Sequence, residues 1–227
     1  MSLLEVKNLK KMYYQGKMEV PALRGVDLKI EKGEFTAIAG PSGSGKTTLL
    51  NHISGLDRPT DGEIILDNQN IGKLSDSELA KIRLYKIGFI FQSYNLIPVL
   101  TAIENVEFVM LLQGIDPETR KKKALAILKE VGLEEYINRR PLDLSGGQQQ
   151  RVAVARAIVS EPAIVIADEP TANLDSVTAS DLLKTMKRLN QEKGITFIFS
   201  THDRLVMEQA QRLILLKDGV VEKDNNY

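Results

Sequence analysis

The chain has 227 residues, of which 43% are hydrophobic and 26% charged, so it is long enough to bury a sizeable core in one large domain or two small ones. Its 30 basic and 30 acidic residues give a formal net charge of zero, which argues against a chain built as a basic nucleic-acid binder. The absence of cysteine excludes disulfide scaffolds and cysteine-based metal sites, and two histidines are too few for an all-histidine metal site.

Short apolar runs alternate with amphipathic stretches along the chain, which indicates an α/β protein. Several runs are continuously apolar and rich in β-branched residues, as expected for strands that are buried on both faces of a parallel sheet. The predicted strands cover residues 4–6, 35–39, 63–66, 88–91, 164–167, 195–200 and 213–216. The pairs Asp67-Asn68 and Asp218-Gly219 each follow a strand and predict turns.

The middle of the chain, residues 95–160, is predicted to be mostly helical. Within 121–131, apolar residues recur at helical spacing. Another helix is predicted over 177–192, where Lys193-Gly194 ends it. We therefore expect a single domain in which 1–94 and 161–227 form a nucleotide-binding α/β core, interrupted by a helical insertion over 95–160.

A phosphate-binding loop is predicted between the strand at 35–39 and a helix that starts near residue 47. The sequence fits the pattern G-x-x-x-x-G-K-[ST], and the residues are Gly40, Pro41, Ser42, Gly43, Ser44, Gly45, Lys46 and Thr47, followed by Thr48. Glycines let the backbone wrap closely around phosphates, so that its N–H groups face them. Lys46 would place a charge at the β- and γ-phosphates, and the Thr47 hydroxyl would bind Mg²⁺. A glycine-rich turn without a ligand is the alternative, but it does not require the lysine.

Two carboxylates follow the apolar strand at 164–167. Asp168 is expected at the carboxyl end of the strand beside the phosphate-binding loop, where it would hold Mg²⁺ directly or through water. Glu169 would polarise an attacking water as a general base. His202 comes just after the strand at 195–200, within reach of a γ-phosphate, although a lone histidine is more often structural. His52, within the first predicted helix, is interpreted as structural.

A second glycine pair lies about a hundred residues further along the chain. Residues 144–148, called the signature here, precede a helix predicted over 149–159, and they are Leu144, Ser145, Gly146, Gly147 and Gln148. Ser145 is a natural N-cap, and the glycines allow backbone N–H groups to approach an anion. A second phosphate-binding surface is most economically explained by a head-to-tail dimer, in which each signature faces the other subunit's phosphate-binding loop. Capping alone favours the simpler interpretation, an ordinary capped helix.

In combination, these motifs resemble the nucleotide-binding subunit of an ABC transporter over essentially the entire chain. Residues 40–47 are similar to Walker A, 164–169 to Walker B, and 144–148 match the LSGGQ signature without substitution. The resemblance implies an ATPase that uses ATP and Mg²⁺, in which Glu169 orients water while Lys46, His202 and the signature stabilise the developing charge.

The resemblance also assigns roles to residues outside those motifs. Gln92 resembles the Q-loop glutamine, which contacts Mg²⁺ and senses the membrane partner. Tyr13 resembles the A-loop aromatic that stacks on adenine, with its neighbour Tyr14 as the alternative. The D-loop is identified by similarity as Asn173, Leu174 and Asp175.

Residues 55–60, 91–98 and 167–175 are similar to the LolD/MacB-type subfamily, which serves lipoprotein release, macrolide or peptide export, and mechanotransmission. This resemblance implies a P-loop NTPase (RecA-like) core with an antiparallel β subdomain and a helical signature subdomain. It also implies a dimer with a second copy and a separate transmembrane permease. The start of the chain, charged by Glu5, lacks a signal-peptide core, and no apolar run approaches the roughly 18 residues of a membrane span. We therefore expect a protein that is soluble when isolated and peripheral, through the permease, at the cytoplasmic face of the membrane.

Three other functions are weighed against this one. An ABC-type ATPase of DNA repair or translation shares the signature but typically adds a coiled coil, a zinc insertion or a second ATPase domain. A degraded ATPase used as a docking scaffold would not need intact Lys46, Asp168, Glu169 and His202. A P-loop kinase would lack the signature. The sequence does not identify the cargo, because the partner selects it.

Overall fold

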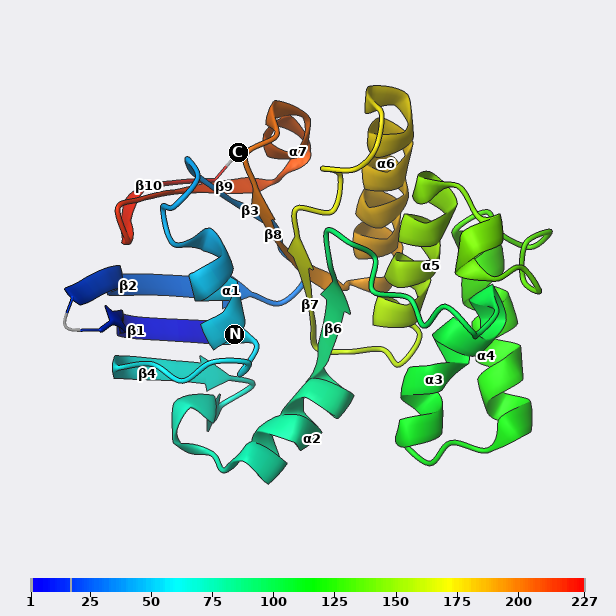
Figure 1. The fold of residues 1–227 in the computed structure, drawn as a ribbon, viewed down its shortest axis with the longest axis horizontal. Coiled ribbons are helices and arrows are strands. Elements are labelled where there is room, and N and C mark those ends of the chain that lie inside the picture. Colours follow the sequence, from blue (N-terminus) through cyan, green and yellow to red (C-terminus); the bar gives the residue numbers. More distant parts are fainter. Residues whose placement is uncertain (1, 17, 227) are drawn as a thin grey trace.

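The computed structural model describes residues 2–16 and 18–226. An antiparallel sheet, a mostly parallel sheet and a group of helices lie side by side (Figure 1). Among the described residues, no helix is both long and apolar enough to cross a bilayer.

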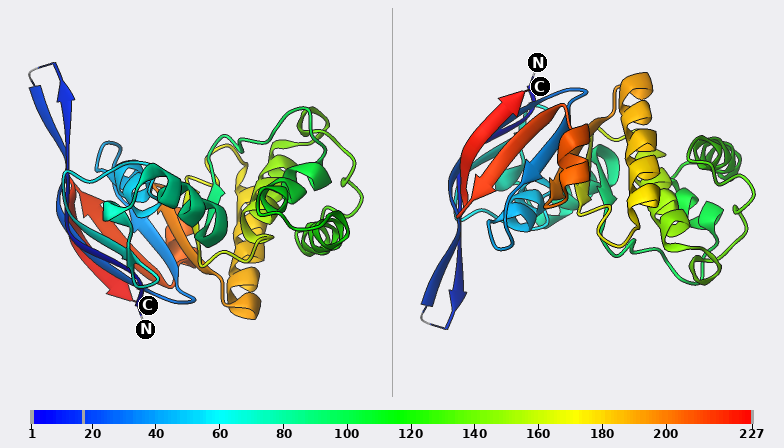
Figure 2. Two further views of the ribbon diagram at one scale, coloured as in Figure 1. Left: turned by 90° about the horizontal axis from the view of Figure 1, so that it is seen from below. Right: turned by 90° about the horizontal axis from the view of Figure 1, so that it is seen from above.

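The antiparallel sheet has the strand order β2-β1-β4-β5. Its strands are β1 (Ser2–Gln15), β2 (Met18–Glu31), β4 (Asp61–Leu66) and β5 (Gln69–Asn70). The hairpin of β1 and β2 projects beyond the rest of the molecule (Figure 2). The strand predicted over 4–6 is shorter than the observed β1. The strand β2 was not predicted, because one of its faces is solvent-exposed and only every second residue near its end is buried. The predicted turn at Asp67-Asn68 is confirmed by left-handed φ values of 50° and 64°.

The second sheet has the order β10-β9-β3-β8-β7-β6, and only β10 runs antiparallel to its neighbour. The strands are β3 (Phe35–Ala39), β6 (Ile87–Ile90), β7 (Ile164–Asp168), β8 (Thr196–Thr201), β9 (Arg212–Lys217) and β10 (Val220–Asn226). The predicted strands in this sheet are confirmed to within one residue at each end. The sequence did not predict β10, which follows the predicted turn at Asp218-Gly219.

The parallel sheet separates two hydrophobic clusters, because alternate side chains of a strand point to opposite faces. Phe35 and Phe199 lie in the cluster that packs against the helices, with ring centroids 4.5 Å apart. Ile38 and Ile198 lie in the other cluster, which extends to the antiparallel sheet and to the first helix. The central strands are therefore fixed from both sides, and their carboxyl ends form a rigid edge.

Seven α-helices and two one-turn 3₁₀ helices occur in the described part of the chain. They are α1 (Lys46–Ile53), α2 (Asp76–Lys86), α3 (Ala102–Leu112), α4 (Pro117–Glu130), α5 (Gly146–Ile158), α6 (Ser176–Lys193), α7 (Arg204–Gln209), and the 3₁₀ helices Ile71–Lys73 and Pro141–Asp143. The helix predicted from residue 121 begins earlier, at Pro117, because Asp116 caps it by accepting from the N–H of Thr119. Gly194, with φ 65°, ends α6 as predicted.

The expected architecture is confirmed: an α/β core, an antiparallel β subdomain and a helical subdomain. Helices α3, α4 and α5 fall within 95–160, and the boundaries of that insertion stay a prediction. Helix α2 was not predicted. Its Ser75 and Glu78 form a capping box, a local signal that the sequence contains.

Candidate active site

A cleft of about 650 Å³ opens at the carboxyl ends of β3 and β7. Ligands of α/β sheets bind at this edge, because the loops that follow the strands converge there. The cleft is lined by Ala22, Pro41, Ser42, Gly43, Gly45, Lys46, Thr47, Thr48, Gln92, Glu169 and His202. It thus gathers the phosphate-binding loop with three residues that follow other strands of the sheet. Ala22, from β2, is a lining residue that the sequence did not predict.

The phosphate-binding loop is held close to neighbouring backbone. A methyl group at Gly40 would lie 2.1 Å from the carbonyl oxygen of Leu216 on β9. At Gly45, where φ is 101°, it would lie 2.7 Å from the carbonyl oxygen of Ala22. Both glycines are therefore required for the loop to pack between β9 and β2. Gly43 has φ 79° with open space around it, so only its backbone conformation favours glycine.

Lys46 begins α1 and is 8% exposed. Its ammonium donates to the carbonyl oxygens of Gly40, at 2.8 Å, and Pro41, at 3.1 Å. Among the described residues, no carboxylate lies within ion-pair distance of this ammonium. A largely buried cation without an acidic partner is costly, and a bound anion relieves that cost.

Asp168 ends β7 beside the loop, and its carboxylate has two hydroxyl neighbours. The Thr47 Oγ1 lies 3.5 Å from both carboxylate oxygens. The Ser200 hydroxyl donates a hydrogen bond to Oδ1. Ser200 was not predicted, and its position follows from strand register, because it pairs with Asp168 across β7 and β8. The cluster offers hard oxygen ligands of the kind that Mg²⁺ prefers.

Glu169 is in contact with His202, with 2.8 Å between Oε1 and the ring Nδ1. The backbone of Glu169 has φ 48°, a strained value for a residue other than glycine, and its N–H donates to the carbonyl oxygen of Ser200. The glutamate side chain is 15% exposed, whereas that of the histidine is 68% exposed. The two side chains are thus in direct contact, which the sequence did not predict.

Gln92 lines the cleft, and the two residues that form the bend beyond it are strained. Tyr94 and Asn95 have left-handed φ values of 60° and 48°. Arg156, on α5, stabilises this bend by donating hydrogen bonds to the carbonyl oxygens of Tyr94, at 2.8 Å, and Asn95, at 2.6 Å. Burial lowers the pKa of Arg156. The sequence did not identify this arginine as a site residue.

The signature lies at the start of α5 and does not line the cleft. Ser145 and Gln148 form a capping box, which confirms the predicted N-cap, and α5 begins at Gly146, three residues before the predicted start. A methyl group at Gly146 would lie 2.8 Å from the Tyr94 hydroxyl, and one at Gly147 would lie 2.4 Å from Thr178 Cγ2. The signature glycines thus pack against the bend at Tyr94 and Asn95 (the Gln92 bend) and against α6. Leu144 is buried.

Residues 173–175 also lie outside the cleft lining. The Asn173 amide donates to the carbonyl oxygen of Gln92, at 2.9 Å. Leu174 packs against the hydrophobic cluster, and Asp175 caps α6 by accepting from Val177 and Thr178 N–H groups. This segment therefore connects Gln92 to α6 and the signature.

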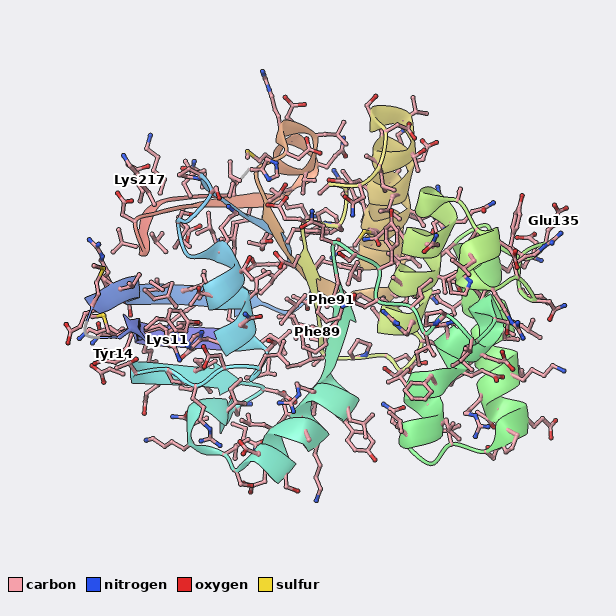
Figure 3. All side chains as sticks on the ribbon, in the orientation of Figure 1. Lys11, Tyr14, Phe89, Phe91, Glu135 and Lys217 are labelled. Atoms are coloured by element: carbon pink, nitrogen blue, oxygen red, sulfur yellow. The ribbon has the colours of Figure 1, made fainter. Side chains whose placement is uncertain are left out.

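The two candidate aromatics on β1 differ in their surroundings. The Tyr13 hydroxyl donates to Asp57, at 2.8 Å, whereas Tyr14 is 66% exposed at the outer end of the antiparallel sheet (Figure 3). His52 is fully buried and contacts the carbonyl oxygens of Thr48 and Arg58, as expected for a structural residue. Burial lowers the pKa of His52.

The fold and this site define a P-loop NTPase, and the chain matches known proteins of that class. A profile of the ABC transporter family matches residues 23–172. An uncharacterized ABC transporter ATP-binding protein of Methanocaldococcus jannaschii, MJ0796, is 49% identical over 98% of this chain and 96% of its own length. A solved dimeric structure of MJ0796 bound to ADP and phosphate superposes with a TM-score of 0.90, covering 98% of each chain at 48% identity.

The chain therefore belongs to the ABC transporter family, and it is an ATP-binding and ATP-hydrolysing subunit of that family. The macrolide export ATP-binding/permease protein MacB of Syntrophobacter fumaroxidans is 44% identical over 99% of this chain, which spans 32% of that protein. The resemblance to the LolD/MacB-type subfamily is thus confirmed, and the alternative role in DNA repair or translation is not supported.

Proposed function

We propose that two copies of this chain bind two ATP molecules between them and drive a transmembrane permease of the LolD/MacB type. One observation carries the proposal: the cleft gathers the phosphate-binding loop, Glu169, Gln92 and His202, while the signature of the same chain lies outside it. A signature that acts on phosphates must then complete the cleft of another subunit.

The residues around Asp168 fit a magnesium ion. Thr47 Oγ1 and the Asp168 carboxylate already lie 3.5 Å apart, and Gln92 can add its side-chain oxygen from the cleft wall. When bound, Mg²⁺ would neutralise charge on the β- and γ-phosphate oxygens. Ser200 would fix the orientation of the Asp168 carboxylate by its hydrogen bond.

In hydrolysis, Glu169 accepts a proton from the attacking water. The water oxygen bonds to the γ-phosphorus as the bond from that phosphorus to the β,γ-bridging oxygen breaks, which yields ADP and phosphate. Lys46 stabilises charge on the transferred group, and so do the backbone N–H groups of the phosphate-binding loop and the partner's signature. His202 holds the Glu169 carboxylate toward the water.

An exposed apolar surface on α2, on α3 and in the segment that follows Gln92 is suited to the permease. Large side chains of α2 and α3 are exposed there, and the two helices meet where Gln113 donates to the carbonyl oxygen of Leu84. The exposed residues are Tyr85 (50%), Phe108 (36%), Leu111 (51%) and Leu112 (57%), with Val99 (72%) in the segment after Gln92. Docking there would place the chain at the cytoplasmic face of the membrane, held by the permease.

The concentration dependence of hydrolysis tests this function. With saturating ATP and Mg²⁺, phosphate release per molecule should fall as the protein is diluted, because each site needs a second subunit. A steady-state phosphate assay over a thousandfold range of protein concentration measures this. Full activity per molecule at every dilution would contradict the proposed shared site.

A further inference from the structure

The ring of Tyr13 is held by two neighbouring side chains. Its hydroxyl donates to Asp57 Oδ2 at 2.8 Å. Lys11 donates to Asp57 Oδ1, also at 2.8 Å, and its ammonium lies 4.9 Å from the centroid of the tyrosine ring. The Asp57 carboxylate thus holds both the Tyr13 ring and the Lys11 ammonium beside it. Tyr13 and Lys11 belong to β1, and Asp57 belongs to the loop after α1.

Asp57 is itself attached to the helix that carries the phosphate-binding lysine. Its backbone N–H donates to the carbonyl oxygen of Asn51 on α1, and its Oδ1 accepts from the N–H of Arg58. Burial opposes ionisation of Asp57, but the hydrogen bonds from Lys11, Tyr13 and Arg58 together lower the pKa of its carboxyl group. The carboxylate is therefore charged at neutral pH and acts as a strong acceptor.

Lys11 covers one face of the Tyr13 ring, as in a cation–π pair. A nucleotide base can then stack only on the opposite face, and 38% of the residue is exposed. The Tyr13 hydroxyl also lies beside Thr48, which lines the cleft. Tyr14 points to the other face of the strand, and no hydrogen bond of its side chain occurs among the described residues.

We propose that Asp57 is a positioning residue for nucleotide binding: together with Lys11 it presets the Tyr13 ring as a platform for the base. Asp57 acts through the tyrosine and does not touch the nucleotide. A ring already held in its bound orientation loses less freedom when the base stacks, which strengthens binding. The proposal rests on the assignment of Tyr13 to base stacking in the proposed function.

A double-mutant cycle tests this role. Tyr13→Phe keeps the ring and removes its hydrogen bond, and Asp57→Ala removes the acceptor. Each change should weaken ADP binding, measured by calorimetry, by about threefold to tenfold, the effect of one hydrogen bond. The double variant should bind no more weakly than Asp57→Ala alone, because Asp57→Ala already lacks the hydrogen bond that Tyr13→Phe removes. Inorganic tripolyphosphate, which has no base, should bind all variants equally.

Two controls separate the possible outcomes. Asp61→Ala removes an exposed ion pair with Lys10 in the same sheet and should leave ADP binding unchanged. Tyr13→Ala removes the platform and should weaken ADP binding by about tenfold or more, since stacking of one base on an aromatic side chain is worth on the order of tenfold. Unchanged ADP binding by Tyr13→Ala would overturn the stacking assignment, and the positioning role with it.

If Tyr13→Ala weakens ADP binding but Tyr13→Phe and Asp57→Ala do not, base stacking on Tyr13 is supported and the positioning role of Asp57 is overturned. Equal losses for ADP and tripolyphosphate in Asp57→Ala would also overturn it, because Asp57 would then act on α1 rather than on the ring. Tyr13→Phe removes a single oxygen, so it keeps the test decisive even if Asp57→Ala fails to fold.

Discussion

Replacing Glu169 with glutamine is expected to lower ATP turnover by about a hundredfold to ten-thousandfold, the usual contribution of a general base. The amide has the shape of the carboxylate but cannot accept a proton from water at neutral pH. It can still contact His202, which lies 2.8 Å from Oε1 in the structure. ATP binding should therefore persist, and the variant should accumulate as an ATP-bound dimer.

Phosphate release, ATP affinity and the sedimentation coefficient with ATP measure these three effects. Glu135→Gln is a matched control, because Glu135 lies in the helical subdomain far from the cleft (Figure 3) and should leave all three unchanged. Turnover of Glu169→Gln at the parental rate would show that another group accepts the proton.

Replacing Lys46 with alanine is expected to weaken ATP binding by about tenfold to a hundredfold, the effect of losing one hydrogen bond to a charged group. The lysine is 8% exposed, so its charge is poorly screened by water, and within the described part of the chain its hydrogen bonds go to carbonyl oxygens of the loop. Calorimetric titration of the Lys46→Ala variant with ATP measures the loss.

Lys184→Ala provides the comparison, because Lys184 is an exposed lysine of α6 paired with Asp181. Its loss should leave ATP affinity unchanged, since surface ion pairs contribute little. An ATP dissociation constant that is the same for Lys46→Ala and the parent would remove the lysine from its assigned role.

The parts of the site that the sequence revealed are those whose chemistry is local. The phosphate-binding loop contains its glycines, lysine and threonine within eight consecutive residues. The signals of β3 and β7 are likewise local, because these strands are buried on both faces and read as continuous apolar runs. In contrast, β2 alternates between core and solvent at its end and contains Gly25, so it was missed.

The residues that the sequence did not reveal act across long separations. Ser200 meets Asp168 only through the register of β8 against β7. Arg156 reaches the Gln92 bend from a helix 61 residues away in sequence, and Asp57 reaches Tyr13 from 44 residues away. No local pattern records such pairs, because the chain topology brings them together. The contact between His202 and Glu169 belongs to the same class, although both residues were identified separately.

The central claim is that each ATP site uses the cleft of one subunit and the signature of the other, and mixing two inactive variants tests it most directly. Lys46→Ala disables the cleft. Ser145→Asp keeps an N-cap for α5 but directs a negative charge at the phosphates. A hybrid dimer of the two has one intact site, so an equal mixture should regain about one quarter of the parental activity. Mixing Lys46→Ala with Glu169→Gln should regain none, because both changes disable the cleft of the subunit that carries them.

Phosphate release from the first mixture is the decisive measurement. Recovery that appears only on mixing Lys46→Ala with Ser145→Asp would match the shared site. If that mixture stays as inactive as its components, although both variants fold and associate, each signature serves its own chain and the account is contradicted.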